Sequence, residues 1–251
     1  MDKLKILDGL YTIRWCLNQE PAKIDGAKVE VTHLINQITL NEPPYETEEP
    51  KDPKDKGTPG HDDKLTATLV VIVGHEKKAP GADFILGGSE YQYNSDIALK
   101  IKQFGAEKYP NLKIEIIYRD GIGIGGAYRK AAALKPDACI ELHFNAFNGR
   151  AHGTETLCSV SSEDKKYAGI IHAKICQVFD RSGSSRGVRV LSRGARGGQS
   201  VYSLPGSANC LVEPFFGDNA EEAKMANERR TPYAMALLEG TVDWLKSQGM
   251  A

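Results

Sequence analysis

The chain has 251 residues, of which 41% are hydrophobic and 26% charged, and its formal net charge is −1. These values are typical of a folded globular protein, and the near-neutral charge gives no bulk attraction to nucleic acid or to an anionic membrane. The five cysteines are widely spaced without a C-x-x-C pair, which argues against a disulfide framework.

The first part of the chain divides into two segments of different composition. Residues 1–41 carry five basic and five acidic side chains and are few for an independent core, so their role stays open between a wall-binding or partner-binding module and an arm packed on the main domain. Residues 42–64 are rich in proline, with eight acidic and four basic side chains. This composition predicts a semi-extended linker, which leaves residues 65–251 as the main domain.

The N-terminal sequence MDKLKILDGLYTIRW has acidic residues and no long apolar run, unlike a secretory signal peptide. The chain also has no apolar stretch of the length that a transmembrane helix needs. We therefore expect synthesis in the cytoplasm without a signal peptide. Any target beyond the cytoplasm would then be reached after release or with the help of a partner, to which residues 1–41 could bind.

After residue 64, apolar runs typical of buried strands alternate with segments of helical periodicity. The predicted strands are 65–74, 112–119, 139–147, 153–160 and 207–216, and the predicted helices are 93–109, 125–135, 165–180 and 221–247, the last with a break at Pro232. This order predicts an α/β fold, with a mainly parallel twisted sheet covered by helices on both faces.

Two glycine-rich stretches are assigned to loops. GIGIGG (121–126) lacks the full spacing and the following acidic residue of a dinucleotide-binding turn. The stretch 180–199 contains five arginines without the interleaved aromatic residues that stack on nucleic-acid bases, so we expect no nucleic-acid partner. We expect a flexible loop there, either plainly solvated or with arginines that meet carboxylates of a substrate.

Polar side chains follow the predicted strands where a parallel sheet of this kind binds its ligands. His75 follows the first strand, His143 and Asn145 lie at the end of the third, Glu213 ends the last, and Glu90 precedes the first helix. A catalytic zinc ion commonly takes three protein ligands from histidine and carboxylate side chains, a set that His75, Glu90 and His143 could supply. A further carboxylate is then needed to transfer protons, and Glu213 is placed to do so.

Six short motifs, in this order along the chain, resemble the zinc-dependent N-acetylmuramoyl-L-alanine amidases of the amidase-3 type. They are VVIVGHEKKAPGADF, the glutamate of SEYQYNSDIALKI, the arginine after IEIIY, ELHFNAF, GTETL and LVEPFFGDN. The resemblance covers about residues 67–247. It implies Zn²⁺ bound by His75, Glu90 and His143, Glu213 as general acid and base, and cleavage of the amide between N-acetylmuramic acid and L-alanine in peptidoglycan.

Three parts of the sequence depart from the family pattern. The loop after His75 reads EKKAPGAD instead of beginning with two glycines, Pro214 and Phe215 replace a variable residue and a glycine, and Glu141 replaces a serine. The changes in the loop after His75 and at Pro214 and Phe215 bear on the walls of the substrate groove. Glu141 points to the same face as His143, where we expect it to hydrogen-bond a ligand histidine, although it could also compete for the metal.

We expect Asn145, Arg129 and Glu141 to form the substrate side of the site, with a structural role for Arg129 as the alternative. His152 and His172 are expected in a turn and in a helix, without a catalytic role. The leading hypothesis is thus a peptidoglycan amidase, and the absence of a signal sequence favours a lytic enzyme of the endolysin type. The alternatives are a related zinc peptidase or deacylase and a non-catalytic cell-wall-binding protein of the same fold.

Overall fold

The computed structural model describes residues 65–250, apart from residues 182, 196 and 197. The predicted N-terminal segment 1–41 and the predicted linker 42–64 lie outside the described residues. Among the helices that the structure describes, none is long and apolar enough to cross a membrane. The domain predicted from residue 65 onward therefore carries the whole structural description that follows.

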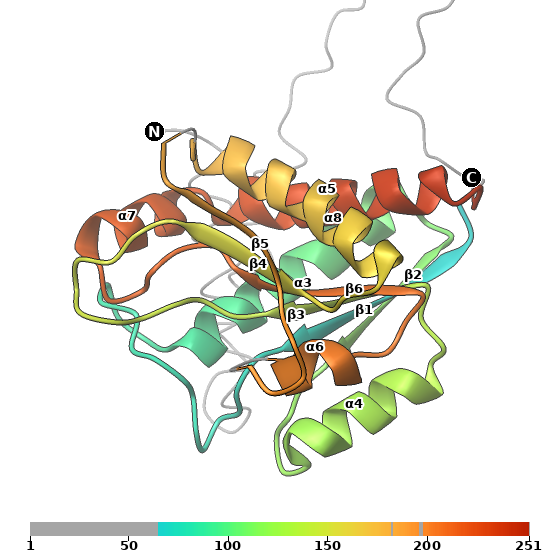
Figure 1. The fold of residues 1–251 in the computed structure, drawn as a ribbon, viewed down its shortest axis with the longest axis horizontal. Coiled ribbons are helices and arrows are strands. Elements are labelled where there is room, and N and C mark those ends of the chain that lie inside the picture. Colours follow the sequence, from blue (N-terminus) through green and yellow to red (C-terminus); the bar gives the residue numbers. More distant parts are fainter. Residues whose placement is uncertain (1–64, 182, 196–197, 251) are drawn as a thin grey trace, which may run out of the picture. The chain divides into compact units, whose positions relative to one another are not determined.

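A six-stranded sheet forms the centre of this domain (Figure 1). Its strands are β1 (Ala67–Val73), β2 (Leu112–Ile117), β3 (Ala138–Leu142), β4 (Thr154–Cys158), β5 (Ser185–Val190) and β6 (Ala208–Glu213). Their spatial order is β2-β1-β3-β6-β4-β5, and every neighbouring pair is parallel except β4 and β6. The carboxyl ends of β1, β3 and β6 therefore meet at one edge of the sheet, where β4 and β5 begin.

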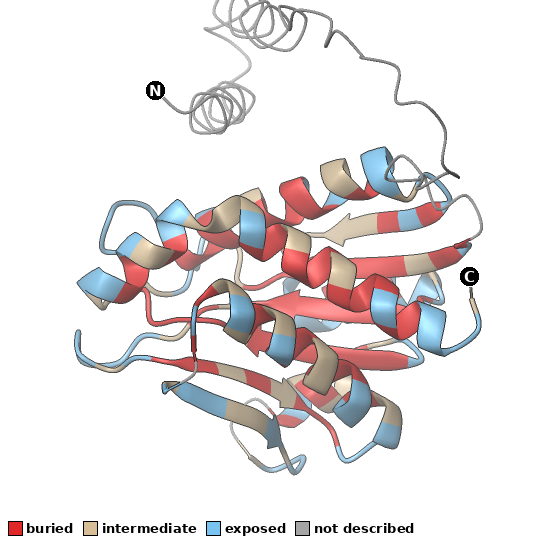
Figure 2. Ribbon diagram, turned by 90° about the horizontal axis from the view of Figure 1, so that it is seen from above, coloured by how far each residue is buried: buried red, intermediate tan, exposed pale blue. Residues whose placement is uncertain are grey.

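Helices cover both faces of the sheet (Figure 1). They are α3 (Glu90–Lys108), α4 (Gly123–Ala133), α5 (Ser162–Val178), α6 (Gly198–Ser203), α7 (Ala220–Glu228) and α8 (Arg230–Ser247). The larger core joins α3, α5 and α8 to one face, and the smaller core packs α4 against β1 and β3 on the other. Figure 2 shows buried residues on the central strands and on the inward sides of these helices. The predicted fold class is confirmed.

The stretch 180–199 differs from its prediction as a flexible loop. Ser185–Val190 forms β5, which pairs with β4 in parallel, and α6 begins at Gly198. The β5 sequence SRGVRV lacks the apolar run of the central strands because it lies at the end of the sheet, where most of its residues stay exposed or half-buried. Pairing with β4 therefore decides its conformation against a weak local signal.

Three predicted boundaries are also wrong. The C-terminal helical region breaks at Arg229, between α7 and α8, and Pro232 lies in the first turn of α8, where a missing backbone N–H leaves no hydrogen bond unmade. The glycines after residue 122 begin α4 instead of forming a loop. The strand predicted to run to residue 147 ends at Leu142, so the two polar residues expected at its end lie in the loop beyond it.

Candidate metal centre

Backbone hydrogen bonds hold the ends of three strands together at the edge of the sheet where β1, β3 and β6 finish. The Gly74 N–H donates to the Leu142 carbonyl over 2.9 Å, and the His143 N–H donates to the Val212 carbonyl over 3.1 Å. His75 lies two residues after β1, His143 directly follows β3, and Glu213 is the last residue of β6. The parallel ladder therefore brings the polar residues at the ends of these three strands to one place.

His75, Glu90 and His143 form a compact group of metal-competent side chains. One ligand atom from each lies within 4.8 Å of the others. One carboxylate oxygen of Glu90 is 2.8 Å from His143 Nδ1, and the other is 3.1 Å from His75 Nε2. The three residues predicted from the sequence as metal ligands thus lie close together in the structure.

Glu90 is held as an ionised carboxylate between the two histidines. Its side chain is almost fully buried, which raises its pKa, but hydrogen bonds from His143 and His75 outweigh burial and lower the pKa to about 2. The backbone N–H groups of Ala82 and Phe144 donate to the same carboxylate over 3.2 and 3.0 Å. The two backbone donors and the two imidazole nitrogens therefore hold the Glu90 carboxylate in place and favour its charged form.

The helix start expected as the structural role of Glu90 coexists with its place in this group. Ser89 is the N-cap of α3, accepting a hydrogen bond from the Gln92 N–H, and Glu90 is the first residue of the helix. A carboxylate in the first turn of a helix is stabilised by the helix dipole. One residue therefore begins α3 and reaches the histidines.

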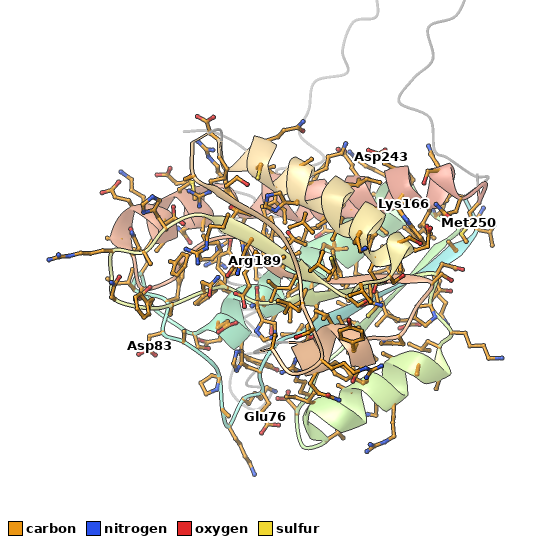
Figure 3. All side chains as sticks on the ribbon, in the orientation of Figure 1. Glu76, Asp83, Lys166, Arg189, Asp243 and Met250 are labelled. Atoms are coloured by element: carbon orange, nitrogen blue, oxygen red, sulfur yellow. The ribbon has the colours of Figure 1, made fainter. Side chains whose placement is uncertain are left out.

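His75 has an unusual backbone conformation, and two nearby glycines leave room for the side chains of the candidate ligands. His75 has a φ of 66°, in the left-handed region that few side chains adopt. A Cβ at Gly74 would lie 2.5 Å from His143 Cε1, and one at Gly81 would lie 2.6 Å from a Glu90 carboxylate oxygen. The two glycines therefore leave the space that the candidate ligands occupy. The loop containing Gly81 replaces the double glycine of the family pattern and runs past Glu76 and Asp83 (Figure 3).

A second contact set holds the loop after β1 in place. Asp120, which follows β2, accepts hydrogen bonds from the Lys77 N–H over 2.8 Å and from the Tyr91 hydroxyl over 2.7 Å. Burial and the neighbouring Asp120 carboxylate raise the pKa of Tyr91, which keeps its hydroxyl protonated as a donor. The EKKAPGAD loop is thus tied both to the end of β2 and to α3.

Glu141 lies beneath this group with no exposed surface. It forms an ion pair with the buried Arg119, accepts a hydrogen bond from the Tyr128 hydroxyl over 2.8 Å, and places a carboxylate oxygen 3.4 Å from His143 Nε2. Burial lowers the pKa of Arg119. The contact with His143 is the kind of outer carboxylate–histidine interaction that orients a metal ligand.

Glu213, Glu155 and Asn145 lie together where β6 ends and β4 begins. Glu213 ends β6, is half-buried, and lies directly opposite Glu155 in the antiparallel register of β4 and β6. The Asn145 side-chain amide donates to a Glu155 oxygen over 2.9 Å, and its backbone N–H donates to the Phe215 carbonyl. These bonds fix the loop that follows His143 against the loop that follows Glu213.

Other residues singled out in the sequence do not join this group. Arg129 is exposed on α4 and makes no hydrogen bond or ion pair with the described residues of the site. His152 is exposed, with Nδ1 3.4 Å from the Arg150 carbonyl. His172 is on α5, with Thr156 of β4 and Ser185 of β5 at its two ring nitrogens. The predicted substrate contact of Arg129 stays a prediction.

Sequence reasoning gave no role to Glu155 or Tyr128, both of which contact candidate site residues. The G-T-E-T-L motif contains Glu155, but its position opposite Glu213 depends on the antiparallel pairing of β4. Tyr128 reaches Glu141 from α4 on the second face of the sheet. The glutamate of the motif was the available signal for the first residue, and the sequence carries none for the second.

The donor set suits a zinc ion. Two imidazole rings and one ionised carboxylate are the ligand types of catalytic zinc sites, which keep a further coordination position open. The histidine side chains are 33% and 12% exposed, so the group is reachable from solvent while Glu90 is covered. The residues present therefore fit the metal that the motifs imply.

Comparisons with known proteins bear on the family and the fold. A family model described as N-acetylmuramoyl-L-alanine amidase matches residues 69–241. Among solved structures, the catalytic domain of the amidase CwlV from Bacillus (Paenibacillus) polymyxa is similar with a TM-score of 0.62 and 22% identity, over 72% of this chain and 99% of that chain. An amidase from Clostridium difficile 630 gives a TM-score of 0.64 and 19% identity, over 74% and 100% of the two chains.

The catalytic domain of the CD27L endolysin, which targets Clostridia difficile, is similar with a TM-score of 0.59 and 25% identity, over 70% of this chain and 97% of that chain. A comparison with curated protein sequences found no match. The similarity to solved structures thus covers nearly the full length of each of these three chains.

Proposed function

Because the chain belongs to the family of N-acetylmuramoyl-L-alanine amidases, we propose that it is a zinc hydrolase that cleaves the amide between N-acetylmuramic acid and L-alanine in peptidoglycan. The observation that carries the proposal is the convergence of His75, Glu90 and His143 at the same edge of the sheet as Glu213. A binding protein of the same fold would not need three ligands and an acid–base group together.

In this proposal, metal binding, proton transfer and substrate contact are assigned to different side chains. His75, Glu90 and His143 would hold the ion, which would supply Lewis acidity that polarises the amide carbonyl and acidifies water. Glu213 takes the proton from the attacking water and passes it to the leaving amine of L-alanine. Asn145, fixed by Glu155, is proposed to contact the substrate beside the metal, as is the more distant Arg129.

Zinc content, measured together with the release of amino groups from purified peptidoglycan, tests the proposal. We expect one zinc per chain and new L-alanine amino ends, with release abolished by a chelator and restored by zinc. His143→Ala should lose both zinc and hydrolysis. Protein that binds no zinc and releases nothing even after zinc is added would contradict the proposal and favour the non-catalytic binding protein.

Mass spectrometry of the digested peptidoglycan separates the amidase from the related zinc peptidase or deacylase. Free L-alanine amino ends and intact peptides identify an amidase, whereas cut peptide cross-links identify a peptidase. An endolysin-type lytic role, and targeting through residues 1–41, stay predictions. Lysis of bacterial cells by the added full chain, but not by residues 65–251 alone, would support such targeting.

We further propose that Glu141 positions His143 instead of binding substrate, because it is fully buried and held by Arg119 and Tyr128. Glu141→Gln keeps the shape of the side chain but removes its charge. It should weaken zinc binding by about 10- to 100-fold, the usual cost of losing an outer partner of a metal ligand. Competition of the apoprotein with a chromogenic chelator measures this affinity.

A matched variant controls for the effect on zinc affinity of any change in this buried region. Tyr128→Phe removes the hydroxyl that donates to Glu141 and leaves the contact between Glu141 and His143 in place. Its zinc affinity should fall less than that of Glu141→Gln. Equal zinc affinity in Glu141→Gln and the wild-type protein would rule out the positioning role.

A further inference from the structure

The arginines of the stretch 180–199 occupy distinct environments. Arg181 is buried and forms a paired ion contact with Glu222. Arg186 and Arg189 lie on β5, and their side chains are 41% and 55% exposed. Arg181 is therefore part of the packed interior, whereas the two arginines of β5 can reach a ligand.

Both β5 arginines approach one carboxylate, that of Glu155. Arg186 Nε is 3.4 Å and Arg189 Nη1 is 3.8 Å from the same Glu155 oxygen, and the other oxygen accepts the hydrogen bond from Asn145. Two guanidinium groups against one carboxylate leave one positive charge. Each guanidinium carries five N–H donors, most of which these long contacts do not use.

This positive charge lies beside the proposed general acid and base. Glu155 is directly opposite Glu213 in the strand register, and the Arg186 guanidinium lies 5.2 Å from the centre of the Phe216 ring, three residues after Glu213. Because Asn145 links Glu155 to the loop after His143, the cluster is connected to the metal centre through one side chain.

The strand face that carries this cluster is partly open to solvent. Along β4, Thr154, Thr156 and Cys158 are buried, whereas Glu155 and Leu157 on the opposite face are half-buried. Arg189, labelled in Figure 3, is the register partner of Leu157. The larger core packs against the opposite face of β4, so the path for a substrate from Glu213 toward β5 runs along the Glu155 end of β4, beside α6.

We propose that Arg186 and Arg189 bind a free carboxylate on the peptide part of the substrate, next to the L-alanine that carries the scissile amide. The inference rests on the proposed function and adds a substrate preference to it. Guanidinium groups bind carboxylates through paired, charge-assisted hydrogen bonds, which suits the unused donors of these side chains. One arginine would suffice to neutralise Glu155, so the second leaves a charge available for a ligand.

A pair of substrates that differ in one group tests this subsite. N-acetylmuramoyl-L-alanyl-D-glutamate and the corresponding amide, D-isoglutamine, differ by a carboxylate against a carboxamide next to L-alanine. We expect the zinc-loaded full chain to favour the carboxylate by about tenfold in kcat/KM, the lower range for a hydrogen bond between charged groups. The double variant Arg186→Gln/Arg189→Gln should reduce this ratio to about one.

A charge-matched control separates the subsite from a general electrostatic effect. Lys108→Gln/Lys166→Gln removes the same number of positive charges from exposed side chains at the last turn of α3 and near the start of α5, remote from the carboxyl ends of β1, β3 and β6. It should keep the wild-type ratio. Arg186→Lys/Arg189→Lys should restore part of the preference, which a purely structural role would not produce.

The outcomes separate this inference from the proposed function. Cleavage of both substrates by the wild-type protein at equal kcat/KM would overturn the subsite and leave the amidase in place. A preference for the carboxylate that survives in Arg186→Gln/Arg189→Gln would overturn it as well. Cleavage of neither of these substrates, nor of peptidoglycan, would overturn the proposed function and the subsite together.

Discussion

Glu213→Gln is expected to keep its zinc and to lower turnover by about 10²- to 10⁴-fold, the range attributed to a positioned acid–base group. Glutamine preserves the size of the side chain and its place at the end of β6 but cannot take a proton from water. Because the proposed metal ligands are His75, Glu90 and His143, the substitution leaves the coordinating groups untouched. Zinc analysis and the rate of release of L-alanine amino ends measure the two effects separately.

A glutamate far from the site supplies the control for this substitution. Glu239 lies on α8 and forms an exposed ion pair with Lys108, so Glu239→Gln makes the same chemical change without altering the strand ends. It should hydrolyse peptidoglycan at the wild-type rate. Lysis by Glu213→Gln at a rate close to that of Glu239→Gln would remove Glu213 from its proposed role.

Glu222→Ala is expected to destabilise the domain by about 3–5 kcal/mol, the usual cost of breaking a buried ion pair by removing one partner. The Arg181 guanidinium donates to both oxygens of Glu222 over 2.6 and 2.7 Å, and both side chains are nearly covered. Glu222 also accepts from the Gly153 and Phe216 N–H groups. The substitution would leave the buried Arg181 guanidinium and the buried N–H groups of Gly153 and Phe216 without the Glu222 carboxylate as acceptor.

Urea unfolding monitored by circular dichroism gives the free energy of unfolding for this comparison. Glu221→Ala is the matched control, because Glu221 is the exposed neighbour in the first turn of α7. Glu221→Ala should lower the free energy of unfolding by about 0.3–1 kcal/mol, the contribution of a carboxylate near a helix N-terminus. Arg181→Met/Glu222→Met should recover part of the stability, since no charge is then left buried. Equal stability of Glu222→Ala and Glu221→Ala would contradict the expectation.

The central strands and the candidate ligands could be predicted from the sequence because a simple geometric rule connects them. Apolar runs define β1, β3 and β6, and parallel pairing brings the polar residues at their ends, His75, His143 and Glu213, to one edge. Glu90 needed the resemblance to a known family as well, because a glutamate after a serine is equally typical of a helix start. The structure shows both properties in that one residue.

The parts that could not be predicted depend on contacts between distant segments. The sequence of β5 contains two arginines and a glycine, and only its pairing with β4 makes it a strand. The direction of β4 is likewise invisible locally, although it decides that Glu155 faces Glu213. The buried pair of Arg119 and Glu141 depends on two strands separated by β1 in the sheet.

The two outermost strands of the sheet bear on how copies of this protein behave at high concentration. An unpaired strand edge can add a strand from another molecule, and charged side chains along it are a common protection against such aggregation. Within the described residues, β5 displays Arg186 and Arg189, and β2 at the opposite end displays Lys113 and Glu115. The β5 arginines would thus help to keep the molecules apart in solution, and preparations lacking them need a check of monodispersity before their kinetics are interpreted.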